Sequence, residues 1–331
     1  MAFIEKTATY LPENVLTNEE LVASFPDWSA NKISKKIGVF SRHIVSGNET
    51  ALDLAEKAAE KVLQDYDKST IDFLLFCTQS PEYFLPSGAC ILQQRLGLST
   101  ACGALDYNLG CSGYVYGLSL ANGLIASGAA KKVLLLTAET YSKHINKLDR
   151  ANRSIFGDGA GATIISEGED NFGKFVFGTD GSGANNLIVP NGGFRNPPDA
   201  NAGLREYQPG SFTSDNDLFM NGPEIFNFTI EAVPAMFESL LRKNDCTIDD
   251  IDLVVFHQAN KFMLEHLRLK IDIPADKFFI DLSDTGNTVS ASIPLALEKA
   301  LAQGLVKSGS KILFAGFGVG YSWAGTIIKW R

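Results

Sequence analysis

Cys111 is the residue of this 331-residue chain best placed to act as a nucleophile. It follows an apolar, strand-like run that ends at Gly110 and precedes an uncharged, helix-like segment that begins at Ser112. A thiol at the N-terminus of a helix faces the positive end of the helix dipole and unpaired N–H groups, which lower its pKa and favour the thiolate. Most cysteines are simply small hydrophobic side chains, but the strand-to-helix position favours a catalytic role here.

His257 and Asn287 are two further polar residues at places where chemistry could occur. His257 ends an apolar run and opens the sequence His-Gln-Ala-Asn, and open α/β sheets present ligand-binding groups at the carboxyl ends of strands. Asn287 lies in a Gly-Asn-Thr segment ahead of a helix predicted over 290–303. Each has a structural alternative, a backbone hydrogen bond for the histidine and a turn or N-cap for the asparagine. The other histidines lie in charged segments and are expected to face solvent: His43, His144 and His266.

Three glycines alternate along Gly316-Phe-Gly-Val-Gly320, directly after a strand predicted over 312–315. Such a pattern can cradle a phosphate when a helix follows it, but the segment 321–329 is strand-like, so the dinucleotide-binding fingerprint is not met. Two interpretations remain. The segment is either a turn that brings a backbone N–H close to a reacting carbonyl or an ordinary β-turn.

The elements that would position these residues recur in the same order in the two halves of the chain. The matching apolar segments, first half then second, are 71–77 with 251–257, 133–137 with 312–315, and 159–166 with 321–329. Amphipathic helical segments at 50–66 and 223–243 precede the first pair. This alternation predicts two mixed sheets that are covered by helices and stacked in layers. Cys111 and Asn287 then precede equivalent helices, so the site is predicted where the halves meet.

We therefore predict two halves, 1–177 and 178–331, which form one duplicated unit. The second half begins with a connecting loop over 178–221 that is dense in Gly, Pro and Asn. A long loop inside a compact domain is more often functional or interfacial than a mere spacer.

Composition argues against several other classes of protein. The 29 basic and 38 acidic residues give a net charge of −9, which opposes non-specific binding to nucleic acid. The segment 107–130 carries no charge but holds too many Gly, Ser and Asn residues to span a membrane. Five cysteines without a CxxC pair argue against a disulfide framework and a zinc ribbon. We see no signal peptide, and we expect a cytoplasmic location.

These motifs resemble, in order and approximate spacing, those of the thiolase-fold condensing enzymes, most closely β-ketoacyl-[acyl-carrier-protein] synthase III. The resemblance covers essentially the whole chain. It is carried by Cys111 in Gly-Cys-Ser-Gly-Tyr, His257 in His-Gln-Ala-Asn, Asn287 in Gly-Asn-Thr, Gly-Asp-Gly-Ala-Gly-Ala at 157–162, and the glycines of 316–320. It implies an α/β fold with α-β-α-β-α layers, built from two pseudo-duplicated halves with mixed five-stranded sheets. It also implies a homodimer.

The resemblance further implies an acyltransferase that performs a decarboxylative Claisen condensation in fatty acid or specialised acyl biosynthesis. Cys111 would accept an acyl group from a primer thioester, and the enolate that forms from malonyl-[acyl-carrier-protein] as CO₂ leaves would attack this acyl-cysteine. His257 and Asn287 would donate hydrogen bonds to the malonyl thioester oxygen, and the N–H groups of Cys111 and Gly318 would form an oxyanion hole. No metal or redox cofactor is expected, because coenzyme A or phosphopantetheine only carries the substrate.

Substrate-binding residues follow from the same resemblance. Arg150 matches the arginine that packs on the adenine of coenzyme A, and Asn221 and Asn260 match asparagines that line the pantetheine tunnel. Leu85 replaces a phenylalanine that, in the family, reaches across the dimer to close the acyl pocket. The smaller side chain predicts a primer larger than acetyl and a specialised product.

The residues near the tunnel mouth leave the acyl donor open. Lys32 and Lys36 stand where the family has a tryptophan and an arginine, and Trp28 lies four residues earlier. Both an acyl-CoA and an acyl-carrier-protein donor therefore remain possible. Together with Lys35, these lysines form either a docking patch for an acidic carrier protein or a solvated helix face.

Three other functions remain open on this fold. A condensation like that of HMG-CoA synthase would use a glutamate where this chain has Gln79, which cannot shuttle a proton. A non-decarboxylative acyl transfer would need Cys111 and a base but not Asn287. A non-catalytic partner subunit of a condensing complex would keep the fold but lose the triad, which is intact in this sequence.

Overall fold

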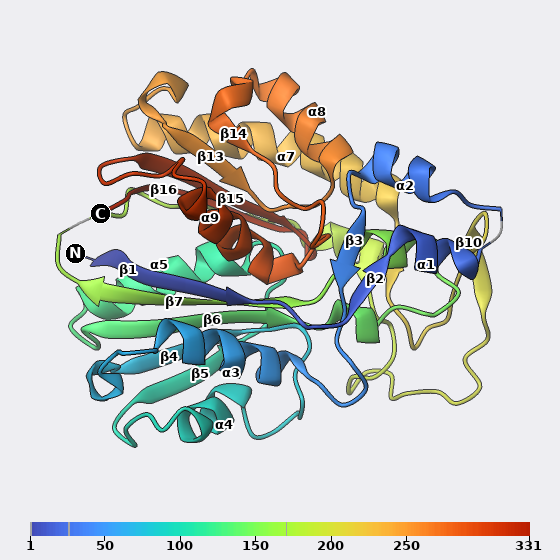
Figure 1. Cartoon of the computed structure of the whole chain (residues 1–331), viewed down its shortest axis with the longest axis horizontal. Coiled ribbons are helices and arrows are strands. Elements are labelled where there is room, and N and C mark those ends of the chain that lie inside the picture. The colour runs from blue at the N-terminus through green and yellow to red at the C-terminus, as the bar shows by residue number, and fades with distance from the viewer. Residues whose placement is uncertain (1, 26, 170) are drawn as a thin grey trace.

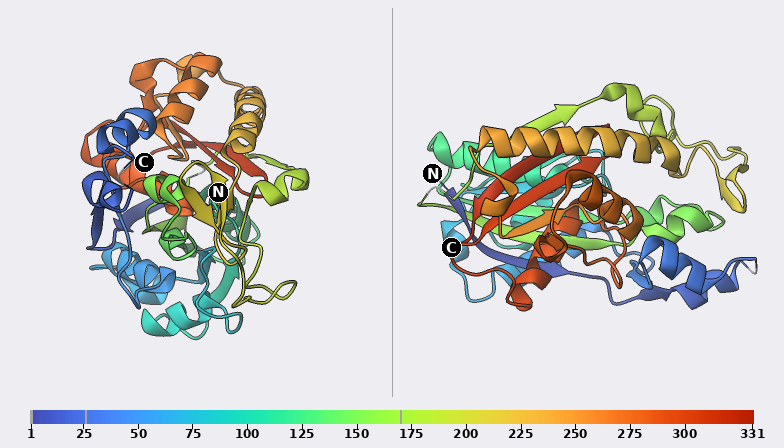
Figure 2. Two further views of the ribbon diagram at one scale, coloured as in Figure 1. Left: turned by 90° about the vertical axis from the view of Figure 1, so that its right-hand side faces the viewer. Right: turned by 90° about the horizontal axis from the view of Figure 1, so that it is seen from above.

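Two five-stranded sheets form the centre of the molecule, and a helical layer separates them (Figure 1). The computed structural model describes residues 2–25, 27–169 and 171–331. Further helices cover the outer face of each sheet, so the layers run α-β-α-β-α, as the family resemblance implies. The layers extend from the end that holds the chain termini to an end built from α1, α2 and β10 (Figures 1 and 2).

The first sheet has the strand order β1-β7-β6-β4-β5. Its strands are β1 (Ala2–Tyr10), β4 (Phe73–Cys77), β5 (Gly103–Tyr107), β6 (Lys132–Glu139) and β7 (Gly159–Glu167). β4 pairs in parallel with β5 and β6, whereas β7 pairs antiparallel with β6 and β1, so the sheet is mixed. The outer helices are α3 (Ala51–Val62) and α4 (Gly88–Arg95), and the inner helix is α5 (Gly113–Ala126).

The second sheet repeats this arrangement strand for strand. Its order is β14-β13-β15-β16-β8, which is the order of the first sheet read from the other edge. The strands are β8 (Val176–Thr179), β13 (Leu253–Phe256), β14 (Phe278–Phe279), β15 (Lys311–Gly318) and β16 (Ser322–Lys329). The pairings keep the same directions, with β13 parallel to β14 and β15, and β16 antiparallel to β15 and β8. The outer helices are α7 (Gly222–Lys243) and α8 (Lys261–Ile271), and the inner helix is α9 (Ser292–Ala302).

The shared middle layer explains the uncharged segment before and within α5. Apolar side chains from α5 and α9 lie in one core cluster with strands of both sheets, so these helices are surrounded by protein. Tyr114 and Leu118 of α5, and Ile293 and Leu297 of α9, are almost fully buried in it. A charged side chain on either inner face would be desolvated without a partner.

The predicted division after residue 177 falls inside β8, whose pairing with β16 places it in the second sheet. The connecting loop is also more regular than expected, since it contains η3 (Gly181–Asn186), β9 (Leu187–Ile188), β10 (Arg205–Gln208), β11 (Ser211–Thr213) and β12 (Phe219–Met220). β10 and β11 form a hairpin at the end of the molecule that also holds α1 and α2.

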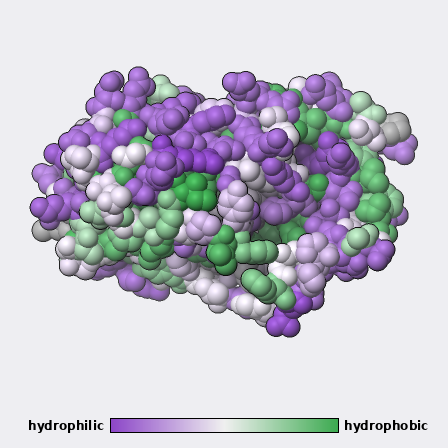
Figure 3. Space-filling model, turned by 90° about the horizontal axis from the view of Figure 1, so that it is seen from below, coloured by the Kyte–Doolittle hydropathy of each residue, from purple (hydrophilic) through white to green (hydrophobic). Residues whose placement is uncertain are grey.

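Smaller elements complete the chain. Those at the α2 end are β2 (Val15–Thr17), α1 (Asn18–Ala23), α2 (Ala30–Ile37), β3 (Ser41–His43) and α6 (Arg150–Ile155). The remaining short turns are η1 (Lys68–Thr70), η2 (Tyr141–Lys143), η4 (Ile248–Asp250), η5 (Ala275–Lys277) and η6 (Val289–Ala291). Seen from below, a mostly hydrophilic surface is interrupted by hydrophobic patches (Figure 3). Among the described residues, we find no helix with the length and apolar content to cross a bilayer.

Candidate active site

Cys111 lies where the two halves of the molecule touch. It follows β5, directly precedes Ser112, the N-cap residue of α5, and is 6% exposed. A Cβ atom added to Gly318, at the end of β15, would lie 2.7 Å from Sγ of Cys111. A Cβ atom added to Gly110 would lie 2.6 Å from Cγ1 of Val319. Glycine is therefore required on both sides for the first half to approach the second.

The pKa of Cys111 differs from the sequence prediction. Burial raises the pKa of its thiol to about 12, and the backbone N–H groups of Val319 and Cys111 itself only partly offset this. The helix-terminus expectation was wrong for the free protein because the sulfur is cut off from water, and desolvation penalises the thiolate. The resting group is therefore a thiol. The N–H of the second half that lowers the pKa of the sulfur belongs to Val319, whereas the resemblance implied that of Gly318.

We predict that alkylation of Cys111 by iodoacetamide accelerates by about tenfold for each pH unit between about pH 7 and pH 9, because the thiolate fraction rises by that factor below the pKa. Peptide mass spectrometry after timed pulses would measure this, with the exposed Cys90 as an internal comparison. A rate at Cys111 that levels off within this range would contradict a burial-raised pKa.

His257 directly follows β13 and is 2% exposed. Its backbone N–H donates to the Ala315 carbonyl of β15 at 2.7 Å, and its Nδ1 lies 2.7 Å from Oγ of Ser292. Burial lowers the pKa of the imidazole to about 3, although a backbone hydrogen bond with Val289 acts to raise it. The ring is therefore neutral at physiological pH. Ser292 thus engages Nδ1, and the backbone of Val289 also acts on the ring.

Two of the other three histidines are less exposed to solvent than the sequence predicts. His144 is half-buried rather than solvated, and burial lowers the pKa of its ring. Its Nε2 lies 3.4 Å from Oγ of Ser80. His43 is also partly buried, whereas His266 is exposed as predicted.

Asn287 bridges the two halves. Its backbone N–H donates to the Ile155 carbonyl at 2.8 Å, and its own carbonyl accepts from Gly157 N–H at 3.0 Å. Its side-chain Oδ1 accepts from the N–H of Val289 at 2.9 Å, and the residue is 6% exposed. Because this bond fixes the amide orientation, Nδ2 remains as the donor for a ligand.

Val289 is held in a strained backbone conformation. Its φ of 55° lies in the left-handed region, which a β-branched residue rarely adopts, and its side chain is fully buried. Such strain costs on the order of 1–3 kcal/mol, persists only where the surroundings enforce it, and is concentrated at functional sites. Here it turns the chain between Asn287 and α9.

Glu139 is a buried carboxylate that sequence reasoning missed. It ends β6, and both of its oxygens accept from the N–H of Gln79 at 3.1 Å. The hydroxyls of Ser80 and Ser290 also donate to it, at 3.2 and 3.0 Å. Burial raises its pKa to about 8. The carboxylate ties the end of the first sheet to the turn that holds Val289, although no motif in the sequence marks it.

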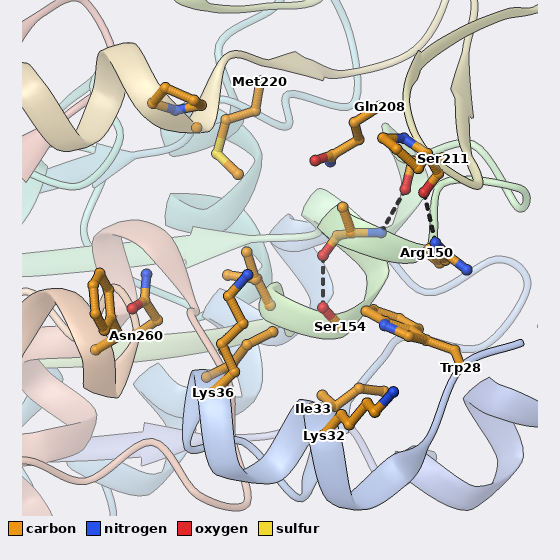
Figure 4. Close-up of a pocket in the computed structure, with 17 residues that line it drawn as sticks. Trp28, Lys32, Ile33, Lys36, Arg150, Ser154, Gln208, Ser211, Met220 and Asn260 are labelled. Atoms are coloured by element: carbon orange, nitrogen blue, oxygen red, sulfur yellow. Dashed lines mark hydrogen bonds between the residues drawn. The ribbon is translucent and has the colours of Figure 1, made fainter.

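A cavity of about 640 Å³ opens between α2, α6, the β10–β11 hairpin and the start of α8 (Figure 4). Four of the predicted substrate-binding residues line it: Lys32, Lys36, Arg150 and Asn260. Trp28 lies on it too, and its ring centroid is 5.2 Å from the guanidinium carbon of Arg150. Arg150 also donates to the Pro209 carbonyl of the hairpin at 2.6 Å. Trp28 thus reaches the cavity in spite of its displacement in the sequence.

Other predicted binding residues have different surroundings. Asn221 is the N-cap of α7 and accepts from the N–H of Glu224, and it is not among the lining residues, although its neighbours are. Asn260 lines the cavity while its Oδ1 caps α8 through Met263 N–H at 2.9 Å. Leu85 lies outside the cavity and is 81% exposed. Within the described parts of the chain, no group of three or more His, Cys, Asp or Glu residues is placed to hold a metal ion.

The duplicated, layered fold is that of the thiolase-type condensing enzymes. Family models agree: that of 3-oxoacyl-[acyl-carrier-protein (ACP)] synthase III matches residues 105–181, and that of its C-terminal part matches residues 241–330. The β-ketoacyl-[acyl-carrier-protein] synthase III of Caldanaerobacter subterraneus subsp. tengcongensis is 36% identical, over 98% of this chain and 96% of the relative.

Solved structures give the same assignment. A crystal structure of a 3-oxoacyl-(acyl-carrier-protein) synthase III superposes with a TM-score of 0.97 at 49% identity, covering 99% of both chains. A 3-oxoacyl-(acyl-carrier protein) synthase from Burkholderia xenovorans LB400 gives 0.92 at 41% identity, covering 99% of this chain and 94% of that one. This chain therefore belongs to the 3-oxoacyl-[acyl-carrier-protein] synthase III family, as the motifs predict.

Proposed function

We propose that this chain joins a primer acyl thioester to malonyl-ACP by decarboxylative condensation and releases a 3-oxoacyl-ACP. The observation that supports this most directly is that Cys111 lies against Gly318 and His257 against Ala315 of the same strand, β15, while Asn287 joins the turn before α9 to the first half. Membership of an acyltransferase family of condensing enzymes supports the same reaction.

In the first step, the Cys111 sulfur attacks the primer thioester carbonyl and the carrier thiol leaves. The new C–S bond replaces the old one, and the thiol proton ends on the departing carrier. The N–H groups of Cys111 and Val319 stabilise the oxyanion, and one such donor is typically worth about 10²–10³ in rate. Gly318, which has no Cβ atom, leaves room for the Cys111 side chain at this point.

In the second step, the malonyl carboxylate leaves as CO₂ and its electron pair forms an enolate. His257 Nε2–H and the Asn287 amide stabilise the developing negative charge on the thioester oxygen. The enolate carbon attacks the acyl-cysteine carbonyl, and the Cys111 thiolate leaves and takes up one proton. A neutral imidazole suits this role, because the buried ring remains a hydrogen-bond donor without carrying a charge of its own.

The cavity beside α2 has the chemistry to bind a coenzyme A donor. The indole of Trp28 and the guanidinium of Arg150 offer flat surfaces for an adenine ring, and Lys32 and Lys36 offer cations for phosphates. Asn260, three residues after His257, links this cavity to the catalytic residues. The aromatic and cationic side chains of this cavity therefore match the adenine ring and the phosphates of coenzyme A.

The same lysines support docking of the acidic carrier protein. The chain carries a net charge of −9, so an acidic partner needs a local basic area, and Lys32, Lys35 and Lys36 are all exposed on α2.

A second copy of the chain is proposed as the dimer partner. Exposed Tyr83, Phe84 and Leu85 form an apolar stretch, and the ring of Phe84 contacts that of Phe194, at 5.3 Å between centroids. Leu85 would then close the partner's acyl pocket, as the resemblance implies.

The proposal predicts that the enzyme forms 3-oxoacyl-ACP from malonyl-ACP and prefers medium-chain primers to acetyl, because Leu85 fills less of the acyl pocket than phenylalanine would. A panel of acyl-CoA and acyl-ACP donors of increasing length, with product mass measured, tests both statements. Turnover with CoA donors alone, or with ACP donors alone, decides the donor class. A preference for acetyl-CoA would refute the longer primer, and no 3-oxoacyl product from any donor would refute the condensation.

A further inference from the structure

A buried serine contacts the catalytic imidazole from behind. Oγ of Ser292 lies 2.7 Å from Nδ1 of His257, and both residues are 2% exposed. Ser292 is the first residue of α9, directly after η6, so its hydroxyl is fixed to the inner helix of the second half. The contact therefore has a rigid support on both sides, since His257 is itself attached to β15 through its backbone.

The surroundings of the hydroxyl decide which group donates. The backbone N–H of Gln258 donates to Oγ of Ser292 at 3.3 Å, so the oxygen already accepts one hydrogen bond. In the part of the chain that the structure describes, the acceptor found for the Ser292 hydroxyl proton is Nδ1 of His257. A buried hydroxyl proton requires an acceptor, so Ser292 donates and Nδ1 accepts. The proton of the neutral ring then resides on Nε2.

We propose that Ser292 is a positioning residue that holds His257 in the tautomer protonated at Nε2, which makes the ring a donor to the malonyl thioester oxygen and not a base for Cys111. The identity of that oxygen rests on the proposed function, whereas the tautomer does not.

The tautomer is measurable in the wild-type protein without any substrate. Nitrogen-15 NMR of the histidine-labelled enzyme separates protonated from unprotonated ring nitrogens, and the chain has only four histidines to assign. We expect a protonated Nε2 and an unprotonated Nδ1 at His257. A proton on Nδ1 would overturn the proposal, even if the enzyme condenses its substrates as proposed.

Two substitutions give the kinetic test. Ser292→Ala allows the ring to adopt either tautomer, and we expect the rate of malonyl decarboxylation to fall about tenfold. This loss is smaller than the roughly 10²–10³-fold loss in rate that typically follows complete removal of one hydrogen-bond donor. Ser292→Asp supplies an acceptor that moves the ring proton to Nδ1, and we expect a loss of about 10²-fold that diminishes as the pH is lowered and the ring gains its second proton. In both variants, acylation of Cys111 keeps its wild-type rate.

The matched control is Ser166→Ala, which removes another buried serine hydroxyl, on β7, where its partner is Glu5. It should leave both steps unchanged. Equal losses of acylation and decarboxylation in the Ser292 variants would indicate a merely structural role and overturn the proposal. If the wild type neither acylates nor decarboxylates, the proposed function fails, and the NMR result still decides the tautomer.

Discussion

Replacement of Cys111 by alanine should abolish the covalent acyl-enzyme and lower condensation by a factor on the order of 10⁴ or more, as expected for a lost nucleophile. Every later step requires the sulfur, because the acyl group stays covalently bound to it until the enolate attacks. Intact-protein mass spectrometry after incubation with each acyl thioester measures the adduct. Wild type should gain one acyl group, and Cys111→Ala none.

The control for this experiment is Cys90→Ala. Cys90 is exposed and can react chemically with thioesters, so its removal should leave the enzymatic adduct intact. Malonyl-ACP decarboxylation should also survive in Cys111→Ala, because His257 and Asn287 remain in place, and that residual activity reports a folded site. An adduct that persists in Cys111→Ala would contradict the mechanism.

The fold was predictable because its signals are local. The apolar runs that became β4 and β13, and the amphipathic stretches that became α3 and α7, are each visible in short windows of sequence. Their recurrence in one order predicted two equivalent sheets, which the strand orders confirm. The uncharged segment that contains α5 likewise predicted a helix buried in protein.

The electrostatics of the site were not predictable in the same way. The position of Cys111 before a helix predicted a lowered pKa, but the burial that raises it comes from β15, some 200 residues later in the chain. Glu139 and Ser290 are 151 residues apart and meet only because the two sheets stack. No spacing rule reveals such contacts, since they depend on how the halves approach each other.

The glycine segment was intermediate between these cases. One of its two interpretations was a backbone N–H beside the reacting group, and the N–H of Val319 does lower the pKa of Cys111 against the effect of burial. The pattern could not show that this N–H belongs to Val319 rather than to Gly318. That assignment depends on which residue at the end of β15 or directly after it faces Cys111, and a shift of one residue would change it.

Asn287→Asp should reduce condensation by about 10³-fold or more, while acylation of Cys111 proceeds normally. Aspartate is nearly isosteric, and one of its oxygens can still accept from the N–H of Val289, so the strained turn keeps its hydrogen bond. The other oxygen replaces the Nδ2 donor with a negative charge, which faces the enolate oxygen. The variant therefore loses a donor and gains a repulsion at the atom where charge develops.

Accumulation of the acyl-enzyme in Asn287→Asp separates condensation from a non-decarboxylative acyl transfer, which would not need this amide. Rapid-quench mass spectrometry for the adduct and CO₂ release from malonyl-ACP measure the two steps. Asn244→Asp is the matched control, since its Oδ1 caps the Lys174 N–H at 2.7 Å away from the catalytic residues. If Asn287→Asp condensed its substrates at the wild-type rate, the Asn287 amide would have no role in the mechanism. A parallel loss of both steps would mean that the substitution disrupts the turn at Val289 instead, because only an enolate-specific effect leaves Cys111 free to acylate.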